Sequence, residues 1–263
     1  MKFSFGRNWL SYSRLALDQS KVALAREAFN SLTQGVELRG AQFLDIGFGQ
    51  GLSLFLAAEA GAYIYGIDVD PICGQALERT QQFFPAQALP RITIVSILDE
   101  HFVREQRKNG GFDVVHSWGV LHHTGDMAKA FRNAAALVKP GGFLIISIYN
   151  KHWTSPLWRA VKYGCNRLPC FMQEGMALAL YPFFYARARS LSNSDGPLAM
   201  RGMDLLHDIR DWLGGYPYEY ASSTDVQQTF SELGFNLVRC HPTKGFTGCN
   251  EFVFKRMPND EEH

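Results

Sequence analysis

One stretch of ten residues decides the fold of this chain, Phe43-Leu44-Asp45-Ile46-Gly47-Phe48-Gly49-Gln50-Gly51-Leu52. A short apolar run contains a carboxylate near its end, glycine follows at every second position, and an apolar helical pattern begins at Leu52. The pattern predicts a strand, a tight loop and the start of a helix. Glycines let such a loop adopt positive φ and let a ligand approach bare main chain at the helix N-terminus. We therefore expect a flat, nucleotide-like ligand at this loop.

The glycine spacing distinguishes two classes of nucleotide loop. The dinucleotide fingerprint G-x-G-x-x-G/A needs a small third residue where helix and strand pack closely. That position is Leu52 here, and the third glycine is Gly51 instead. The pattern D-x-G-x-G-x-G after a strand resembles motif I of the class I S-adenosylmethionine-dependent methyltransferases. The resemblance implies S-adenosylmethionine as the cofactor, with Asp45, Gly47, Gly49 and Gly51 at its binding site.

Composition sets the broad class of the protein. At 263 residues and 46% hydrophobic composition, the chain is long enough for one large core, or for a core and a cap. A net charge of +1 gives no overall field that favours nucleic acid, so no DNA partner is expected. The five cysteines form no C-x-x-C pair, which favours reduced thiols over a disulfide framework or a zinc site.

The hydropathy pattern bears on location. The N-terminus lacks the apolar core of a signal peptide, and no apolar run reaches the length of about 18 residues that spanning a membrane requires. We expect a cytoplasmic protein without a transmembrane segment, and a homodimer is compatible with the sequence.

Alternating strand and helix patterns follow the glycine loop. Five expected strands alternate with four helices, which predicts a doubly wound parallel α/β sheet, with the strands at 43–46, 62–68, 91–97, 112–117 and 143–150. The helix between the second and third strands is expected over 72–84, before Pro85. A helix over 223–233 and two further strands, at 235–240 and 251–255, close the chain. The resemblance then implies a Rossmann-like seven-stranded sheet with an antiparallel last strand.

Two segments lie outside this alternating core, which we assign to 40–150 and 222–256. Residues 1–39 form an N-terminal helical segment, in which Phe5, Trp9 and Tyr12 either cover a sheet edge or fold over the cofactor as a lid. Residues 151–221 are expected to be a helical cap inserted after strand five.

The first part of this cap, residues 151–190, contains six basic residues and one acid, Glu174. It either closes the pocket or also contacts an amphiphilic or anionic substrate.

Acids end the second and third expected strands. Asp68 lies about 20 residues beyond the glycine loop, where the carboxylate of a β-α-β unit accepts hydrogen bonds from ribose hydroxyls. The alternative role, a helix N-cap, suits Asp70 better. The resemblance implies that Asp99 meets the adenine amino group, although it could equally form a turn before His101. The remaining residues expected at the cofactor are Val69, Leu98, Ser117 and Trp118.

The loop after strand four carries the candidate acid–base groups. It contains Val120-Leu121-His122-His123, which resembles the V-L-H-H loop of small-molecule methyltransferases and departs from the N/D-P-P-Y/F loop of amide and adenine-amine methyltransferases. One of the two histidines could act as a general base, because neutral imidazole has a pKa near working pH; the alternative is that either packs against the next helix. His207 is a third candidate base.

A polar, aromatic segment ends the cap. Residues 214–219, Gly-Gly-Tyr-Pro-Tyr-Glu, resemble a G-G-Y-P-x-E segment of bacterial methyltransferases. The segment either contributes to the substrate site or forms a hinge between cap and core. The expected substrate-binding residues are Trp9, Tyr12, Tyr149, Asn150, Tyr216 and Glu219. No H-x-x-x-H or H-E-x-x-H spacing occurs, so no metal site is expected.

The resemblance implies transfer of a methyl group to an O, N, S or activated C atom of a small or lipid-like metabolite. Three alternatives stay open from the sequence. The first is a nicotinamide-dependent oxidoreductase, against which Leu52 counts. The second is a non-catalytic module that binds cofactor and a partner. The third is an RNA methyltransferase, which would need a basic stripe.

Overall fold

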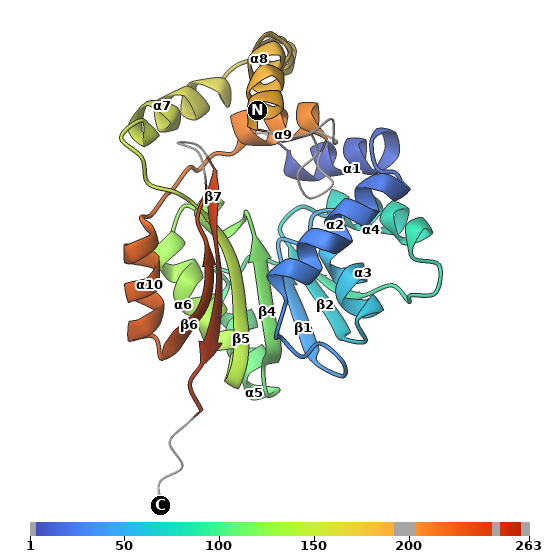
Figure 1. The fold of residues 1–263 in the computed structure, drawn as a ribbon, viewed down its shortest axis with the longest axis vertical. Coiled ribbons are helices and arrows are strands. Elements are labelled where there is room, and N and C mark those ends of the chain that lie inside the picture. Colours follow the sequence, from blue (N-terminus) through green and yellow to red (C-terminus); the bar gives the residue numbers. More distant parts are fainter. Residues whose placement is uncertain (1–3, 192–203, 244–247, 259–263) are drawn as a thin grey trace, which may run out of the picture.

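The structure is a computed structural model that describes residues 4–191, 204–243 and 248–258 (Figure 1). Its seven strands form one sheet in the order β3-β2-β1-β4-β5-β7-β6, with the strands at β1 Gln42–Ile46, β2 Tyr63–Asp68, β3 Arg91–Ile94, β4 Phe112–Trp118, β5 Val138–Tyr149, β6 Phe235–His241 and β7 Cys249–Arg256. The first five strands are parallel, and β7 is antiparallel to both β5 and β6. The expected doubly wound sheet with an antiparallel last strand is confirmed.

Helices cover both faces of this sheet. One face packs against α2 Gln19–Leu32, α3 Leu52–Glu59 and α4 Ile72–Thr80, and the other against α5 Glu100–Lys108, α6 Met127–Leu137 and α10 Ser223–Glu232. Side chains alternate between the faces: Phe43 of β1 joins the first cluster, whereas Leu44 and Ile46 join the second. Because both faces are buried, the central strands are apolar along nearly their whole length.

Two elements end earlier than the sequence pattern predicts. Strand β3 stops at Ile94, because Ser96 starts a turn in which its carbonyl accepts from the Asp99 N–H at 3.0 Å and its Oγ accepts from the Leu98 N–H at 3.1 Å. Helix α4 ends at Thr80 and continues as a short 3-10 helix, Gln81–Phe83. Both changes are local, and the register of the sheet is unaffected.

The described residues between β5 and α10 form three helices, α7 Ser155–Cys165, α8 Cys170–Leu191 and α9 Leu205–Gly214, which we call the cap. Its two ends meet, because the Ala221 N–H donates to the Tyr149 carbonyl at 3.1 Å and the Lys151 N–H to the Ala221 carbonyl at 3.0 Å. The cap stands above the carboxyl ends of the parallel strands, next to α1 Phe5–Leu15 (Figure 1). In the described parts of the chain, no helix has the length and hydropathy to span a bilayer.

Candidate functional site

The glycine loop between β1 and α3 has the geometry that its sequence predicts. Gly47, Gly49 and Gly51 have φ of 72°, 55° and 77°, in the left-handed region that side chains other than glycine rarely adopt. A Cβ atom on Gly47 would lie 2.5 Å from the Val120 side chain, and one on Gly49 would lie 3.0 Å from the Trp9 indole nitrogen. Glycine is therefore required here both by backbone conformation and by close approach.

Asp68 at the end of β2 is already oriented toward this loop. Its Oδ2 accepts from the Gly49 N–H at 3.0 Å, and its Oδ1 accepts from the Asp70 N–H at 2.9 Å. Burial raises the pKa of Asp68, and the two backbone donors oppose that shift. The backbone N–H groups of Gly49 and Asp70 thus hold the Asp68 carboxylate beside the glycine loop.

Asp45, the acid of the glycine motif, lies against the neighbouring strand. Its Oδ1 lies 2.7 Å from His116 Nδ1 of β4, and both side chains are buried. The His116 ring stacks on Phe43. His116 was not predicted from the sequence, although Asp45 and His116 are register partners in the parallel sheet.

The third acid, Asp99, is the N-cap of α5. Its Oδ1 accepts from the His101 N–H at 2.8 Å and the Phe102 N–H at 3.0 Å. These bonds match the turn-forming alternative for Asp99. The contact of Asp99 with adenine stays a prediction. Beside the acids, Val69 is 68% exposed and Leu98 is half-buried.

The end of β4 is tied to its neighbours on both sides. Ser117 is fully buried, and its Oγ donates to the Ile46 carbonyl at 3.2 Å. The indole N–H of Trp118 donates to Glu251 Oε1 of β7 at 2.9 Å. These two bonds fix the point at which the histidine loop leaves the sheet.

Both histidines of the loop are held neutral. The Tyr149 N–H donates to His122 Nδ1 at 3.3 Å, and burial lowers the pKa of His122. His123 Nδ1 lies 2.6 Å from the Pro217 carbonyl and therefore carries the proton, which leaves Nε2 with a free lone pair. Burial, followed by the charge of Lys162, lowers the pKa of His123 to about 3.

His207 lies at a different place, on α9 against α1. Its Nδ1 is 2.7 Å from Asp204 Oδ2, and its Nε2 is 3.1 Å from Ser11 Oγ. Its ring also packs edge-on against Tyr12. Nδ1 is engaged with the N-cap of its own helix and Nε2 with α1, which leaves neither nitrogen for accepting a substrate proton.

Lys162 of α7 is a buried cation that the sequence did not predict. Its side chain is fully buried, and its ammonium donates to the Trp212 carbonyl. The ammonium lies 4.8 Å from the ring centroids of Trp212 and Tyr218 and 5.1 Å from that of Tyr149. Burial lowers the pKa of Lys162 to about 7. Lys162 lies on the buried side of α7 with Ser155 and Cys165, and no local motif marks it in the sequence.

The charge of Lys162 acts on two carboxyl groups of α9. Desolvation raises the pKa of Asp208 to about 6 and that of Asp211 to about 7, and the charge of Lys162 opposes both shifts. Asp211 Oδ1 is buried and has no hydrogen-bond partner among the described residues. Asp208 is solvent-accessible, yet desolvation dominates its pKa.

The predicted substrate-binding residues divide into two groups. Trp9 contacts the glycine loop, and Tyr149 packs between His122 and Tyr218. The others make contacts that hold the fold together: Tyr12 is fully buried in the core, Asn150 Oδ1 accepts from Asn250 at 3.0 Å, Tyr216 packs on Tyr163, and the Glu219 carboxylate accepts from the Gly125 and Met127 N–H groups at 3.0 and 3.2 Å. Glu219 therefore matches the hinge alternative.

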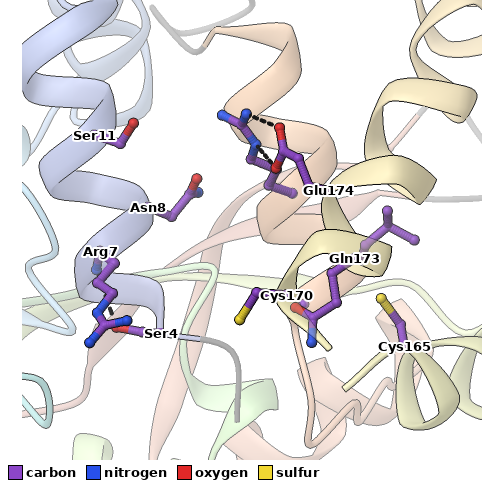
Figure 2. Close-up of a pocket in the computed structure, with 11 residues that line it drawn as sticks. Ser4, Arg7, Asn8, Ser11, Cys165, Cys170, Gln173 and Glu174 are labelled. Carbon is purple, nitrogen blue, oxygen red and sulfur yellow. Dashed lines mark hydrogen bonds and ion pairs between the residues drawn. The ribbon is translucent and has the colours of Figure 1, made fainter. Parts of the chain in front are cut away.

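A pocket of about 280 Å³ lies between α1 and the cap. Figure 2 shows Asn8 and Ser11 of α1 on one side and Gln173 and Glu174 of α8 on the other. None of the predicted site residues lines it. Nor does the described part of the chain hold a group of three or more His, Cys, Asp or Glu residues that could bind a metal ion.

This chain resembles known proteins in both sequence and fold. The family model of the methyltransferase domain matches residues 21–239. The chain belongs to the methyltransferase domain family. The fold of this family member is also that of solved methyltransferases: magnesium protoporphyrin IX methyltransferase from Synechocystis PCC 6803 has a TM-score of 0.58 at 16% identity, with 96% of this chain and 94% of that chain covered. An N-methyltransferase from Bradyrhizobium japonicum WM9 has a TM-score of 0.53 at 15% identity, with 96% of each chain covered.

Curated relatives match about half of this family member. Ubiquinone biosynthesis O-methyltransferase of Marinobacter nauticus is 30% identical over 142 residues, which cover 53% of this chain and 58% of the relative. The protein of the same name from Albidiferax ferrireducens is 34% identical over 132 residues, or 49% of this chain and 50% of the relative. The chain thus spans between half and three fifths of the length of these two relatives.

Proposed function

We propose that this protein transfers the methyl group of S-adenosylmethionine to a small or amphiphilic acceptor held beneath the cap. The observation that carries the proposal is the Asp68 carboxylate, bonded at 3.0 Å to the Gly49 N–H where β1 and β2 end. In a sheet of this topology, the carboxyl ends of the strands form the ligand crevice. Membership of the methyltransferase domain family supports the proposal.

The residues at the loop fit a nucleoside cofactor. Three glycines with positive φ leave bare backbone for a ligand, and Asp68 offers a half-buried acceptor for ribose hydroxyls. Gln50 in the same loop is buried, and its Oε1 has no hydrogen-bond partner among the described residues. Such an orphaned acceptor favours a ligand that donates to it. When bound, S-adenosylmethionine would supply an electrophilic methyl group on sulfur.

The chain itself would orient the acceptor and exclude water. The acceptor would lie beside the strand-four loop, where Tyr149 and the free Nε2 of His123 come together. Because its pKa is about 3, His123 suits a hydrogen bond to the acceptor better than removal of its proton. The charge of Lys162 also acts on Asp208. With a pKa of about 6, the Asp208 carboxylate is a stronger base than the His123 ring.

We also propose the division of the chain into a lid (1–39), a core (40–150 and 222–256) and a cap (151–221). Contact between Trp9 and Gly49 supports the lid. The loop with His122 and His123 supports an acceptor of the small-molecule type. The buried thiols of Cys73 and Cys165, which form no disulfide, support a cytoplasmic location.

Calorimetric titration with S-adenosylmethionine tests the cofactor assignment. Asp68→Asn keeps the shape of the side chain but removes its charge, and we expect affinity to fall by roughly tenfold to a hundredfold, as for a charged hydrogen bond of about 1.5–3 kcal/mol. Glu78→Gln, an exposed residue on α4, is the matched control and should bind like the wild type. Absence of binding by the wild type, or equal binding by Asp68→Asn, would overturn the assignment.

A further inference from the structure

The outer side of the cap exposes large apolar side chains to solvent. The exposed fractions are 84% for Trp153, 60% for Leu157, 40% for Tyr163, 76% for Phe171, 53% for Leu178 and 59% for Phe183. We call these six residues the cap surface. They belong to α7, α8 and the loop before α7, which lie at the top of Figure 1, far from the sheet. Large exposed apolar patches on a protein mark interaction sites.

Helix α8 shows why this surface needs a partner. Its 22 residues, CFMQEGMALALYPFFYARARSL, are apolar on all sides rather than along one stripe. One side packs on α9, where Ala177 joins a cluster with Ile209 and Leu213. The opposite side carries Leu178 and Phe183 in solvent. A helix that is apolar all round is normally covered on every side.

The charges around the cap surface are positive. Lys151, Arg159 and Arg167 are exposed, and none of them forms an ion pair with a described carboxylate. The Arg167 guanidinium lies 3.9 Å from the centroid of the Tyr163 ring, so apolar and cationic groups are interleaved. Glu174 is the one acid between residues 151 and 191, and it is paired with Arg210 at 2.9 Å.

We propose that the cap surface docks on a lipid membrane that contains anionic lipids. Aromatic and aliphatic side chains beside Lys and Arg are the composition of protein surfaces that lie in the membrane interface. No helix in the described ranges could cross the bilayer, so the contact would be with its surface. The docking stands independently of the proposed methyl transfer.

A second copy of the chain fits this surface less well. A two-fold interface would place the cap surface against itself, because each subunit uses the same patch. Lys151, Arg159 and Arg167 of one copy would then approach the same cations of the other, with no unpaired acid from residues 151–191 between them. An anionic lipid surface offers the opposite charge and attracts each of these side chains.

Docking would also explain a recess at the edge of the cap surface. A cavity of about 430 Å³ is lined by Lys151, His152, Trp153, Pro156 and Tyr220. If Trp153 lies in the interface, this cavity opens toward the lipid phase. An amphiphilic acceptor would then reach the protein from the membrane, and this last step rests on the proposed function.

Vesicle flotation tests the docking. Purified full-length protein is mixed with phosphatidylcholine vesicles that contain either no phosphatidylglycerol or 30% of it, at low and high salt. We expect binding to the anionic vesicles at low salt and much weaker binding at high salt or without the anionic lipid. Arg159→Gln/Arg167→Gln should reduce partitioning on the order of thirtyfold, from about 1 kcal/mol for each arginine. Leu157→Ser/Phe171→Ser should lose at least tenfold.

Two matched control variants test whether vesicle binding depends on the cap surface. Arg104→Gln/Lys108→Gln removes two exposed cations from α5, and Leu15→Ser removes an apolar side chain that is 82% exposed on α1. Both should partition like the wild type. Circular dichroism checks that each variant is folded, and the arginine pair tests the proposal even if the apolar pair unfolds.

Failure to bind anionic vesicles, or equal binding by wild type and both cap variants, would overturn the proposal. So would a dimer, detected by light scattering, that dissociates in Leu157→Ser/Phe171→Ser. Cofactor binding measured on the same samples separates this failure from a failure of the proposed function.

Discussion

Three ionisable side chains of the cap helices α7 and α9 have pKa values far from their ordinary range. Lys162 is lowered to about 7, whereas Asp208 and Asp211 are raised to about 6 and 7. Burial is the first cause in each case, because it disfavours the charged form of both acids and bases. Perturbed groups of this kind concentrate at functional sites, and the charge of Lys162 also acts on His123 of the strand-four loop.

Asp211→Asn should make the protein more stable above neutral pH. The folded pKa of Asp211, about 7, is raised above the unfolded value of about 3.9, so its contribution to stability is full below pH 4 and is lost as pH rises to 7. Asparagine removes this loss, and we expect a gain of roughly 2 kcal/mol at pH 8 that shrinks toward pH 4. Urea unfolding at pH 5 and 8 measures it, with Glu78→Gln as control. Equal destabilisation at both pH values would contradict the assigned pKa.

The histidines of the strand-four loop should stay neutral through the physiological range. The pKa of His123 is lowered to about 3, and its Nδ1 donates to Pro217. We expect nitrogen NMR shifts of a neutral ring protonated at Nδ1, unchanged between pH 5 and 8. A titration with a midpoint near 6.5, assigned by its absence in His123→Gln, would show instead that this ring is poised to act as a base.

Local spacing was enough to predict some residues of the site but not others. The glycine loop and Asp68 follow from a short motif and from the length of one β-α-β unit. Asp45 and His116 are 71 positions apart, and only the parallel register brings them to 2.7 Å. Lys162 meets Tyr149 and Tyr218 because the cap folds back over β5, which no sequence period encodes.

At the scale of single elements, helix α1 is held in place by one carboxylate of the core. Asp70 Oδ2 accepts from Ser4 Oγ at 3.0 Å and from the Gly6 N–H at 3.1 Å. This places Trp9 of the same helix against Gly49. The lid and the sheet-edge alternatives for this segment are thus not exclusive, because Tyr12 is buried in the core while Trp9 covers the loop.

Gly6→Ala should release α1 without unfolding the core. A Cβ at Gly6 would lie 2.6 Å from the Asp70 carboxylate, so the helix or the carboxylate must move. We expect faster amide hydrogen exchange across residues 5–15, weaker S-adenosylmethionine binding and unchanged exchange in β4 and β5. Gly164→Ala on α7, where nothing lies within 4 Å of the new atom, is the control. Unchanged exchange in Gly6→Ala would show that α1 is held by other contacts.

The strands and helices of the alternating core that the sequence pattern located were predicted with errors only at their ends. Alternating apolar runs and caps fix a strand or helix locally, so β1, β4 and α10 lie close to where the pattern puts them. Strand β3 is shorter because Ser96 uses its side chain and carbonyl for a turn, which competes with the ladder.

At the scale of the whole molecule, the class of the sheet was predicted from the sequence, whereas the packing of the cap was not. Short right-handed crossovers leave few arrangements for five alternating strands, and the sheet β3-β2-β1-β4-β5-β7-β6 is one of them. The cap has no such repeat, so its contacts depend on side-chain packing. The cap, which separates the core from the exposed apolar and basic cap surface, is where we expect acceptor specificity to arise.

The most direct test of the account is transfer of a radiolabelled methyl group from S-adenosylmethionine to a cell extract, followed by separation into aqueous small-molecule, organic-soluble, RNA and protein fractions. We predict label in the small-molecule or organic-soluble fraction with the wild type and with Glu78→Gln, and little with Asp68→Asn. Binding of the cofactor without any transfer, which indicates a non-catalytic module, or label confined to RNA would contradict the account.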